Sequence, residues 1–325
     1  MKTPLLVRHP APYPTESLLG YVLRLSEKNG YLSPSALCRV AGITLNDLGN
    51  VGLRGERLAA IASCGVADLN KIAFAASANG RRSSQLLGHR LVPSELSLAK
   101  PKLCAQCVVE MGFIEAHWHL ELMVACPIHR CLATSKCPKC GERLRWLRPG
   151  VLECNCGENL QDSEMPVVSS SEAALLDIIR RKLLGYPASD DNPLSLPQAQ
   201  LMAMDLRSML AVVRAIAKYR LVVDRYTADP DAQQIILAAS RVLMDWPKNF
   251  SVLLKDIGQQ ASSGDYVGVG KQYGDIYRAL FRNPAITPST CVRGIYLTPP
   301  NATGCGLTRV ANGAGSVCIA CWARR

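Results

Sequence analysis

Closely spaced cysteines between residues 104 and 156 constrain the fold more than any other feature of this 325-residue chain. In the first set, Cys104-x2-Cys107 is followed after 18 residues by Cys126-x2-His129. Pairs with this spacing bring two ligands onto one ion, and four such ligands suit tetrahedral Zn²⁺. A site with four protein ligands leaves no position open for a reacting water. The sequence therefore predicts a structural zinc site at Cys104, Cys107, Cys126 and His129.

A second set follows directly, with Cys137-x2-Cys140 separated by thirteen residues from Cys154-x-Cys156. We expect a second structural zinc ion at Cys137, Cys140, Cys154 and Cys156. Three further donors near these sets are expected to pack or to face solvent, or alternatively to replace an assigned ligand: His117, His119 and Cys131. A third zinc ion is an open alternative at a less regular group: Cys291, Cys305, Cys318 and Cys321.

The cysteines also indicate a compartment. Fourteen cysteines in a long chain favour metal binding under reducing conditions over a disulfide scaffold. No apolar stretch approaches the roughly 18 residues of a membrane span, and the N-terminus lacks the apolar block of a secretory signal. We therefore expect a cytoplasmic protein without a membrane partner.

Apolar periodicity predicts a mainly α-helical chain in three parts. Residues 1–100 read as a helix-turn-helix-like bundle, 101–165 as a tandem zinc-binding region, and 166–325 as a C-terminal helical domain with an unassigned cysteine-bearing tail. In the bundle, Thr15 is expected to cap the first helix, and Asn29-Gly30 to end it. Further helices are predicted at 34–41, 46–48, 56–62, 68–76, 172–184, 201–220, 231–245 and 249–257.

The segment Ser33–Leu48 resembles a helix-turn-helix, whose second helix would enter a major groove. A three-helix packing motif without DNA contact is an equal alternative. The net charge of +11 favours a polyanionic partner. Candidate phosphate contacts are Arg81, Arg82, Arg143, Arg145, Arg148, Arg324 and Arg325.

Sequence signatures of catalysis are missing. Gly268-Val269-Gly270-Lys271 resembles part of a phosphate-binding loop, but Asp265 and Gln272 stand where the motif needs Gly and Ser or Thr. The chain contains neither a Gly-x-Ser-x-Gly elbow nor a His-Glu-x-x-His pair. We expect no enzyme; a zinc-stabilised nuclease is a minor alternative.

An ordered series of motifs resembles the TniQ family of transposon target-selection proteins. A Pro-rich lead runs into Glu16-Ser17-Leu18 and an Arg24-bearing helix, followed by Cys126-Pro127-x-His129 and Cys137-Pro138-x-Cys140-Gly141. Asp245-Trp246-Pro247 and the segment 273–280 are similar to the helical half of longer members. Cys131 and the tail after Asn283 depart from the family pattern.

The resemblance implies a non-catalytic adaptor in DNA transposition, a form of DNA recombination. Such an adaptor links a target-site recogniser to an AAA+ ATPase regulator, and it recognises target DNA directly or through an RNA-guided complex, as in CRISPR-associated transposons. A homodimer is a further possibility that the family suggests. The alternative is a stand-alone zinc/helix-turn-helix DNA-binding transcriptional regulator.

Overall fold

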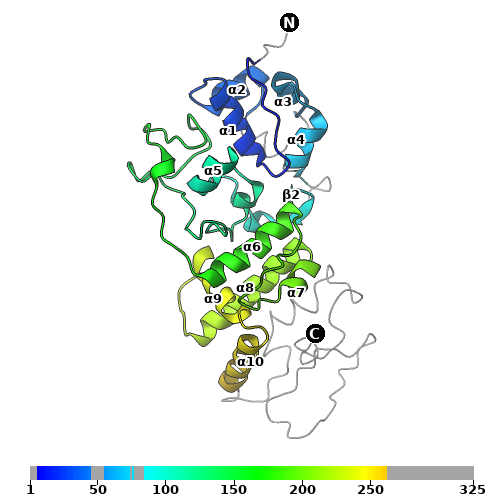
Figure 1. Cartoon of the computed structure of the whole chain (residues 1–325), viewed down its shortest axis with the longest axis vertical. Coiled ribbons are helices and arrows are strands. Elements are labelled where there is room, and N and C mark those ends of the chain that lie inside the picture. Colours follow the sequence, from blue (N-terminus) through cyan, green and yellow to red (C-terminus); the bar gives the residue numbers. More distant parts are fainter. Residues whose placement is uncertain (1–5, 45–54, 74, 77–83, 262–325) are drawn as a thin grey trace. The chain divides into compact units, whose positions relative to one another are not determined.

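The computed structural model describes residues 6–44, 55–73, 75–76 and 84–261 (Figure 1). Within these ranges the chain forms ten α-helices and one small sheet, which confirms the mainly α fold class. The chain divides into two compact units, Met1–Tyr186 and Pro187–Arg325. The domain boundaries predicted near residues 100 and 165 stay a prediction.

The first two helices follow from their capping residues. Helix α1 (Leu18–Lys28) begins after Ser17, whose hydroxyl accepts a hydrogen bond from the Gly20 N–H at 2.9 Å. The expected cap at Thr15 was therefore wrong by two residues. Helix α2 (Pro34–Ala41) has Ser33 as its N-cap and ends at Gly42, in the left-handed region at φ +64°, as predicted.

The rest of the N-terminal segment is less helical than predicted. Helix α3 spans Gly55–Ala62, but α4 (Val66–Ile72) ends four residues earlier than expected. Ala75 and Ala76 instead form strand β1, which pairs antiparallel with β2 (Ser84–Leu86), and β2 pairs with β3 (His89–Leu91). Two-residue strands carry no legible sequence period, which explains the miss.

Several predictions lie outside the described residues. These are the turn at 46–48, which includes the second helix of the helix-turn-helix, the segment 273–280 and the four C-terminal cysteines.

Between β3 and the last helix of the first unit, the chain is mostly irregular. It contains α5 (Ala105–Met111) and short 3-10 turns at Pro93–Glu95, Ala116–His119 and Leu160–Asp162. Isolated antiparallel bridges close small loops, among them Ala125 to Leu132 and Lys136 to Arg143. Helix α6 (Ser170–Leu184) then begins at a capping box formed by Ser169 and Glu172 and ends at Gly185.

The described part of the second unit is a helical bundle of α7 (Gln198–Ala203), α8 (Leu206–Val223), α9 (Ala232–Leu243) and α10 (Lys248–Ala261), with α8 packed on α9 and α10. The prediction of one helix over 201–220 was wrong. Asp205 is extended and caps α8 by accepting a hydrogen bond from the Ser208 N–H, so the chain breaks there. Among the described helices, none has both the length and the apolar character needed to cross a membrane.

Candidate metal centres

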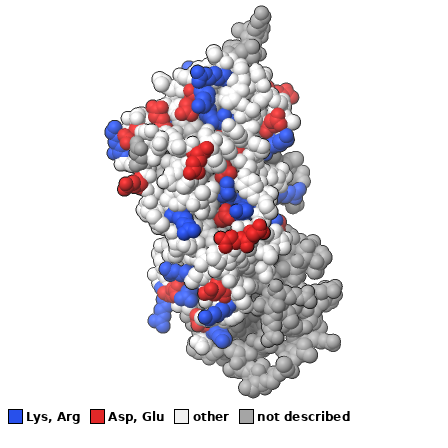
Figure 2. Space-filling model, viewed as in Figure 1, with Lys and Arg blue, Asp and Glu red and all other residues white. Residues whose placement is uncertain are grey.

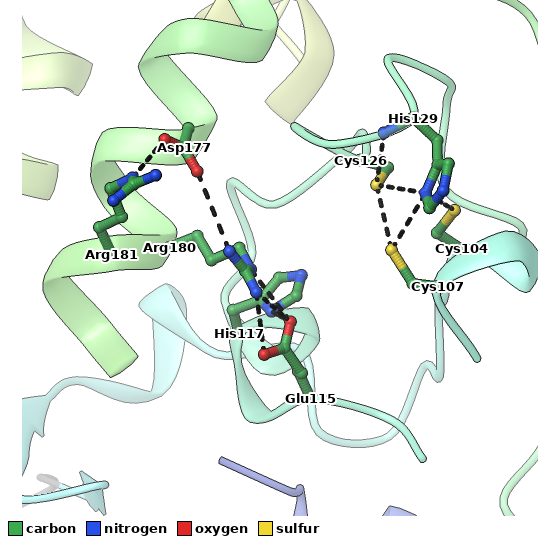
Figure 3. A network of polar contacts seen from close by, with 9 residues as sticks. All are labelled: Cys104, Cys107, Glu115, His117, Cys126, His129, Asp177, Arg180 and Arg181. Atoms are coloured by element: carbon green, nitrogen blue, oxygen red, sulfur yellow. Dashed lines mark hydrogen bonds and ion pairs between the residues drawn. The ribbon is translucent and has the colours of Figure 1, made fainter. Parts of the chain in front are cut away.

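The first cysteine set converges on one point in the structure (Figure 3). Cys104 is the N-cap of α5, and Cys107 lies in the first turn of that helix. Cys126 and His129 lie in the loop closed by the Ala125–Leu132 bridge. The His129 Nδ1 atom lies 3.4, 3.2 and 3.5 Å from the sulfurs of Cys104, Cys107 and Cys126, and the Cys107 and Cys126 sulfurs are 3.4 Å apart.

These separations fit a single tetrahedral ion. Zinc–sulfur bonds of about 2.3 Å place the sulfurs of a tetrahedral site about 3.8 Å apart, close to the 3.4 Å between the Cys107 and Cys126 sulfurs. The Nε2 atom of His129 lies 2.9 Å from Glu110 Oε1, a carboxylate that orients the ring so that Nδ1 faces the sulfurs. Contact between the sulfurs lowers the pKa of Cys104 and raises that of Cys107. The donor set can therefore hold a metal ion.

The second set also converges. The Cys137 and Cys156 sulfurs lie 3.6 Å apart, and those of Cys140 and Cys154 lie 3.9 Å apart. All four ligand atoms lie within 4.8 Å of one another, and none of the described cysteines forms a disulfide. Gly141 and Gly157 follow the two pairs with φ values of +71° and +83°, which an L side chain would strain. Because Cys140 and Cys156 are exposed, this cluster lies nearer to solvent than the first.

The three nearby donors lie outside the two groups of four. Both histidines are buried: His119 Nε2 is 2.7 Å from the Ser17 hydroxyl, and His117 Nδ1 is 3.3 Å from Glu115. Cys131 is half-buried, and its sulfur lies 3.8 Å from that of Cys104. Burial and the neighbouring Cys104 sulfur raise the pKa of Cys131 above its ordinary value.

A buried ionic network beside the first cluster was missed by the sequence analysis (Figure 3). Arg180 on α6 donates two hydrogen bonds of 3.0 Å to the Glu115 carboxylate, which is 1% exposed. Asp177 lies 4.0 Å from Arg180 and 2.5 Å from Arg181. Burial alone would raise the pKa of Glu115, but His117 and Arg180 lower it below its ordinary value. Sequence spacing could pair Asp177 with Arg180 at i, i+3 and with Arg181 at i, i+4, but it could not pair Glu115 with Arg180.

A second buried pair explains the Glu16-Ser17 motif. Arg24 donates hydrogen bonds of 2.7 Å from Nε and Nη2 to the Glu16 carboxylate, which is fully buried. Burial raises the pKa of Glu16, and the Arg24 guanidinium opposes this rise. Glu16 also forms an antiparallel bridge with Glu115, and the Ser17 N–H donates to the Ile114 carbonyl at 2.9 Å. The start of α1 is thereby fixed to the segment between the two ligand pairs of the first cluster.

The candidate phosphate contacts divide in the structure. Arg143 and Arg145 are exposed, whereas the alternating residues Leu144 and Trp146 are buried. Both arginines line a cavity of about 390 Å³ beside the second cluster. Arg148 is 1% exposed and donates hydrogen bonds to three backbone carbonyls, so the expectation that it contacts phosphate is corrected to a structural role. The other four arginines lie outside the described residues: Arg81, Arg82, Arg324 and Arg325.

Positive and negative charges are mixed on the visible face of the described residues. On the face shown in Figure 2, Lys and Arg side chains are interspersed with Asp and Glu. The net charge of +11 is thus not gathered into one broad basic patch on that face.

The fold and the two clusters define a helical protein whose irregular middle region can be held together by metal ions. The model of the TniQ family matches residues 7–132, which include α1 and the whole of the first cluster. The family inferred from the sequence motifs is thereby confirmed over these residues, and it associates this part of the chain with target selection in transposition. No curated protein matches the chain.

Proposed function

We propose that this protein is a non-catalytic target-selection adaptor in DNA transposition, which links a target-site recogniser to an AAA+ ATPase regulator. The observation that carries the proposal is the TniQ match over residues 7–132. The contacts of Glu16 and Ser17 support it, because they give these motif residues a role in fixing α1 beside the first cluster. This task needs defined binding surfaces rather than a reacting water.

Two structural zinc ions are part of the proposal. The ligands would be Cys104, Cys107, Cys126 and His129 for the first ion, and Cys137, Cys140, Cys154 and Cys156 for the second. Zinc suits both donor sets, because it accepts thiolate sulfur and imidazole nitrogen in tetrahedral geometry. Each ion would neutralise thiolates that repel one another and would close loops that have little regular secondary structure.

We propose that the segment carrying Arg143 and Arg145 is the part of the protein surface that contacts the polyanion. The exposed Lys136 forms a backbone bridge with Arg143 and adds a third cation. The phosphates would belong to target DNA or to the RNA and DNA of a guide complex, and either would be met in the cytoplasm. A homodimer would present this segment twice.

The test is association of the full chain with the ATPase regulator of its own transposon, with and without target DNA. We expect a stable complex, and no association under either condition would refute the adaptor role. An Arg143→Gln/Arg145→Gln variant should weaken nucleic-acid binding and reduce the slope of log affinity against log salt by about 2, one for each lost phosphate contact.

An Arg90→Gln variant is the matched control, since Arg90 is exposed on β3 and lies outside this segment. If it weakens binding equally, the assignment of the segment is wrong. Sequence-specific protection of a short operator, without any ATPase partner, would instead support the transcriptional-regulator alternative.

A further inference from the structure

The first cluster has a fourth sulfur beside it, which its tetrahedral donor set of three sulfurs and one imidazole does not use. Cys131 Sγ lies 3.8 Å from Cys104 Sγ, which is van der Waals contact between sulfur atoms. Cys104, Cys107, Cys126 and His129 already supply four ligand atoms within 4.8 Å of one another. A metal ion bound there would leave the Cys131 thiol free of the ion but touching one of its ligands.

The backbone holds this thiol in place. The Cys126 N–H donates a 2.7 Å hydrogen bond to the Cys131 carbonyl, and Cys131 also forms an antiparallel bridge with Val167. A disulfide needs its sulfurs about 2.05 Å apart, so the Cys104 and Cys131 sulfurs must approach by about 1.8 Å to form one. Cys131 is half-buried, whereas Cys104 is buried, so small oxidants reach the pair from the Cys131 side.

We propose that Cys104 and Cys131 form a reversible disulfide in response to a hydroperoxide, and that its formation expels the metal ion from the first cluster. This inference rests on the proposed metal occupancy of that cluster. Cys131 acts as the resolving thiol, and Cys104 is the sulfur that is oxidised first.

The reaction takes two balanced steps. The Cys104 thiolate attacks the terminal oxygen of the hydroperoxide; an S–O bond forms, the O–O bond breaks, and hydroxide or alkoxide leaves, so that Cys104 becomes a sulfenic acid. The Cys131 sulfur then attacks the Cys104 sulfur; an S–S bond forms, the S–O bond breaks, and water leaves with the thiol proton. Two thiol groups have lost two electrons, and the peroxide has gained them.

Loss of Cys104 leaves three donors, two sulfurs and one imidazole. A closed zinc site uses four protein ligands, so loss of one lowers the affinity for the ion and releases it to a competing chelator. A thiol reductant together with zinc would restore the site. The second cluster contains no such spare thiol among the described cysteines, because all four of its sulfurs are in the donor set.

The experiment uses the full-length protein and begins with its zinc content. Hydrogen peroxide is then added, released zinc is followed with a chromogenic chelator, and each cysteine is quantified by isotope-coded alkylation and peptide mass spectrometry. Wild-type protein should give a Cys104–Cys131 linked peptide together with zinc release. In Cys131→Ser, oxidation of Cys104 to a disulfide should be roughly tenfold slower or more, since a thiol already in contact reacts far faster than one that must diffuse.

Cys64→Ser is the matched control, because Cys64 is another half-buried cysteine outside both clusters, and it should behave like wild type. A linked peptide that joins Cys104 to Cys107 or Cys126 instead, or an unchanged rate in Cys131→Ser, would overturn the inference while the zinc proposal stands. If the protein is isolated in a folded state without zinc, the metal proposal is refuted, and so is the proposed expulsion of the ion.

Discussion

The buried pair of Glu115 and Arg180 allows a sharp comparison between two adjacent arginines on one helix. Arg180 makes two hydrogen bonds to a carboxylate that is 1% exposed, whereas Arg181 pairs with Asp177 where both side chains are more than a quarter exposed. Replacing Arg180 by Met leaves the Glu115 charge buried, which costs about 3–5 kcal/mol of unfolding free energy. Replacing Arg181 by Met removes a partly exposed i, i+4 pair worth about 0.5 kcal/mol.

The expected shift in melting temperature follows from the size of the unit. The first unit spans 186 residues, and a domain of that length loses about 2–4 °C per kcal/mol. Arg180→Met should therefore melt about 6–20 °C below wild type, and Arg181→Met within about 2 °C of it. Thermal unfolding followed by tryptophan fluorescence suits this measurement, because Trp118 contacts His117 beside the pair, with ring centroids 4.6 Å apart.

A double variant separates the buried charge from lost packing. Glu115→Gln/Arg180→Met removes both charges and should regain part of the stability lost in Arg180→Met, because no uncompensated carboxylate remains. Equal melting temperatures for Arg180→Met and Arg181→Met would refute the reasoning. So would a double variant less stable than Arg180→Met.

Three further predictions concern the metal, pH and the buried guanidinium. Cys107→Ser should carry about one zinc ion fewer per chain than wild type by elemental analysis, and an unchanged content would contradict the first site. Burial lowers the pKa of His119 to about 3, so between this value and about 6.5 the unfolded chain binds more protons. Stability should therefore fall as the pH drops below 6.5, by up to about 1.4 kcal/mol per pH unit from this residue, and urea titrations of His119→Gln should show a shallower fall. Arg148→Leu should lower the urea midpoint of unfolding, because it leaves buried carbonyls unpaired at a cost of about 1–3 kcal/mol each. Arg145→Gln should leave the midpoint unchanged. A larger loss of stability in Arg145→Gln than in Arg148→Leu would refute this reasoning.

Much of the candidate site was legible in the sequence because it depends on local spacing. Cys104-x2-Cys107 and Cys126-x2-His129 each fix two donors within one turn, so only the meeting of the pairs needed the structure. The ends of α2 at Ser33-Pro34 and Gly42 were predictable for the same reason, because a helix cap depends on hydrogen bonds and backbone angles within a few residues.

The misses involve partners distant in sequence. Glu115 and Arg180 are 65 residues apart, and no period connects them. Arg148 looks like Arg143 and Arg145 in the sequence, but it lies in the bend at residues 146–150, where its guanidinium is buried against backbone carbonyls. The break at Asp205 was hidden because apolar residues continue on both sides of it, and only the extended backbone there reveals a new cap.

The hydrogen bond between Ser17 and His119 joins residues 102 positions apart. During synthesis, the first helix therefore cannot make this contact until residue 119 has left the ribosome. The ion-pair partner of Glu115 is Arg180, which lies 65 positions after it in the chain. A fragment cut at residue 132, where the family match ends, would retain Glu115 but lack the arginine that neutralises it. The shortest self-sufficient piece should extend through α6, to residue 186.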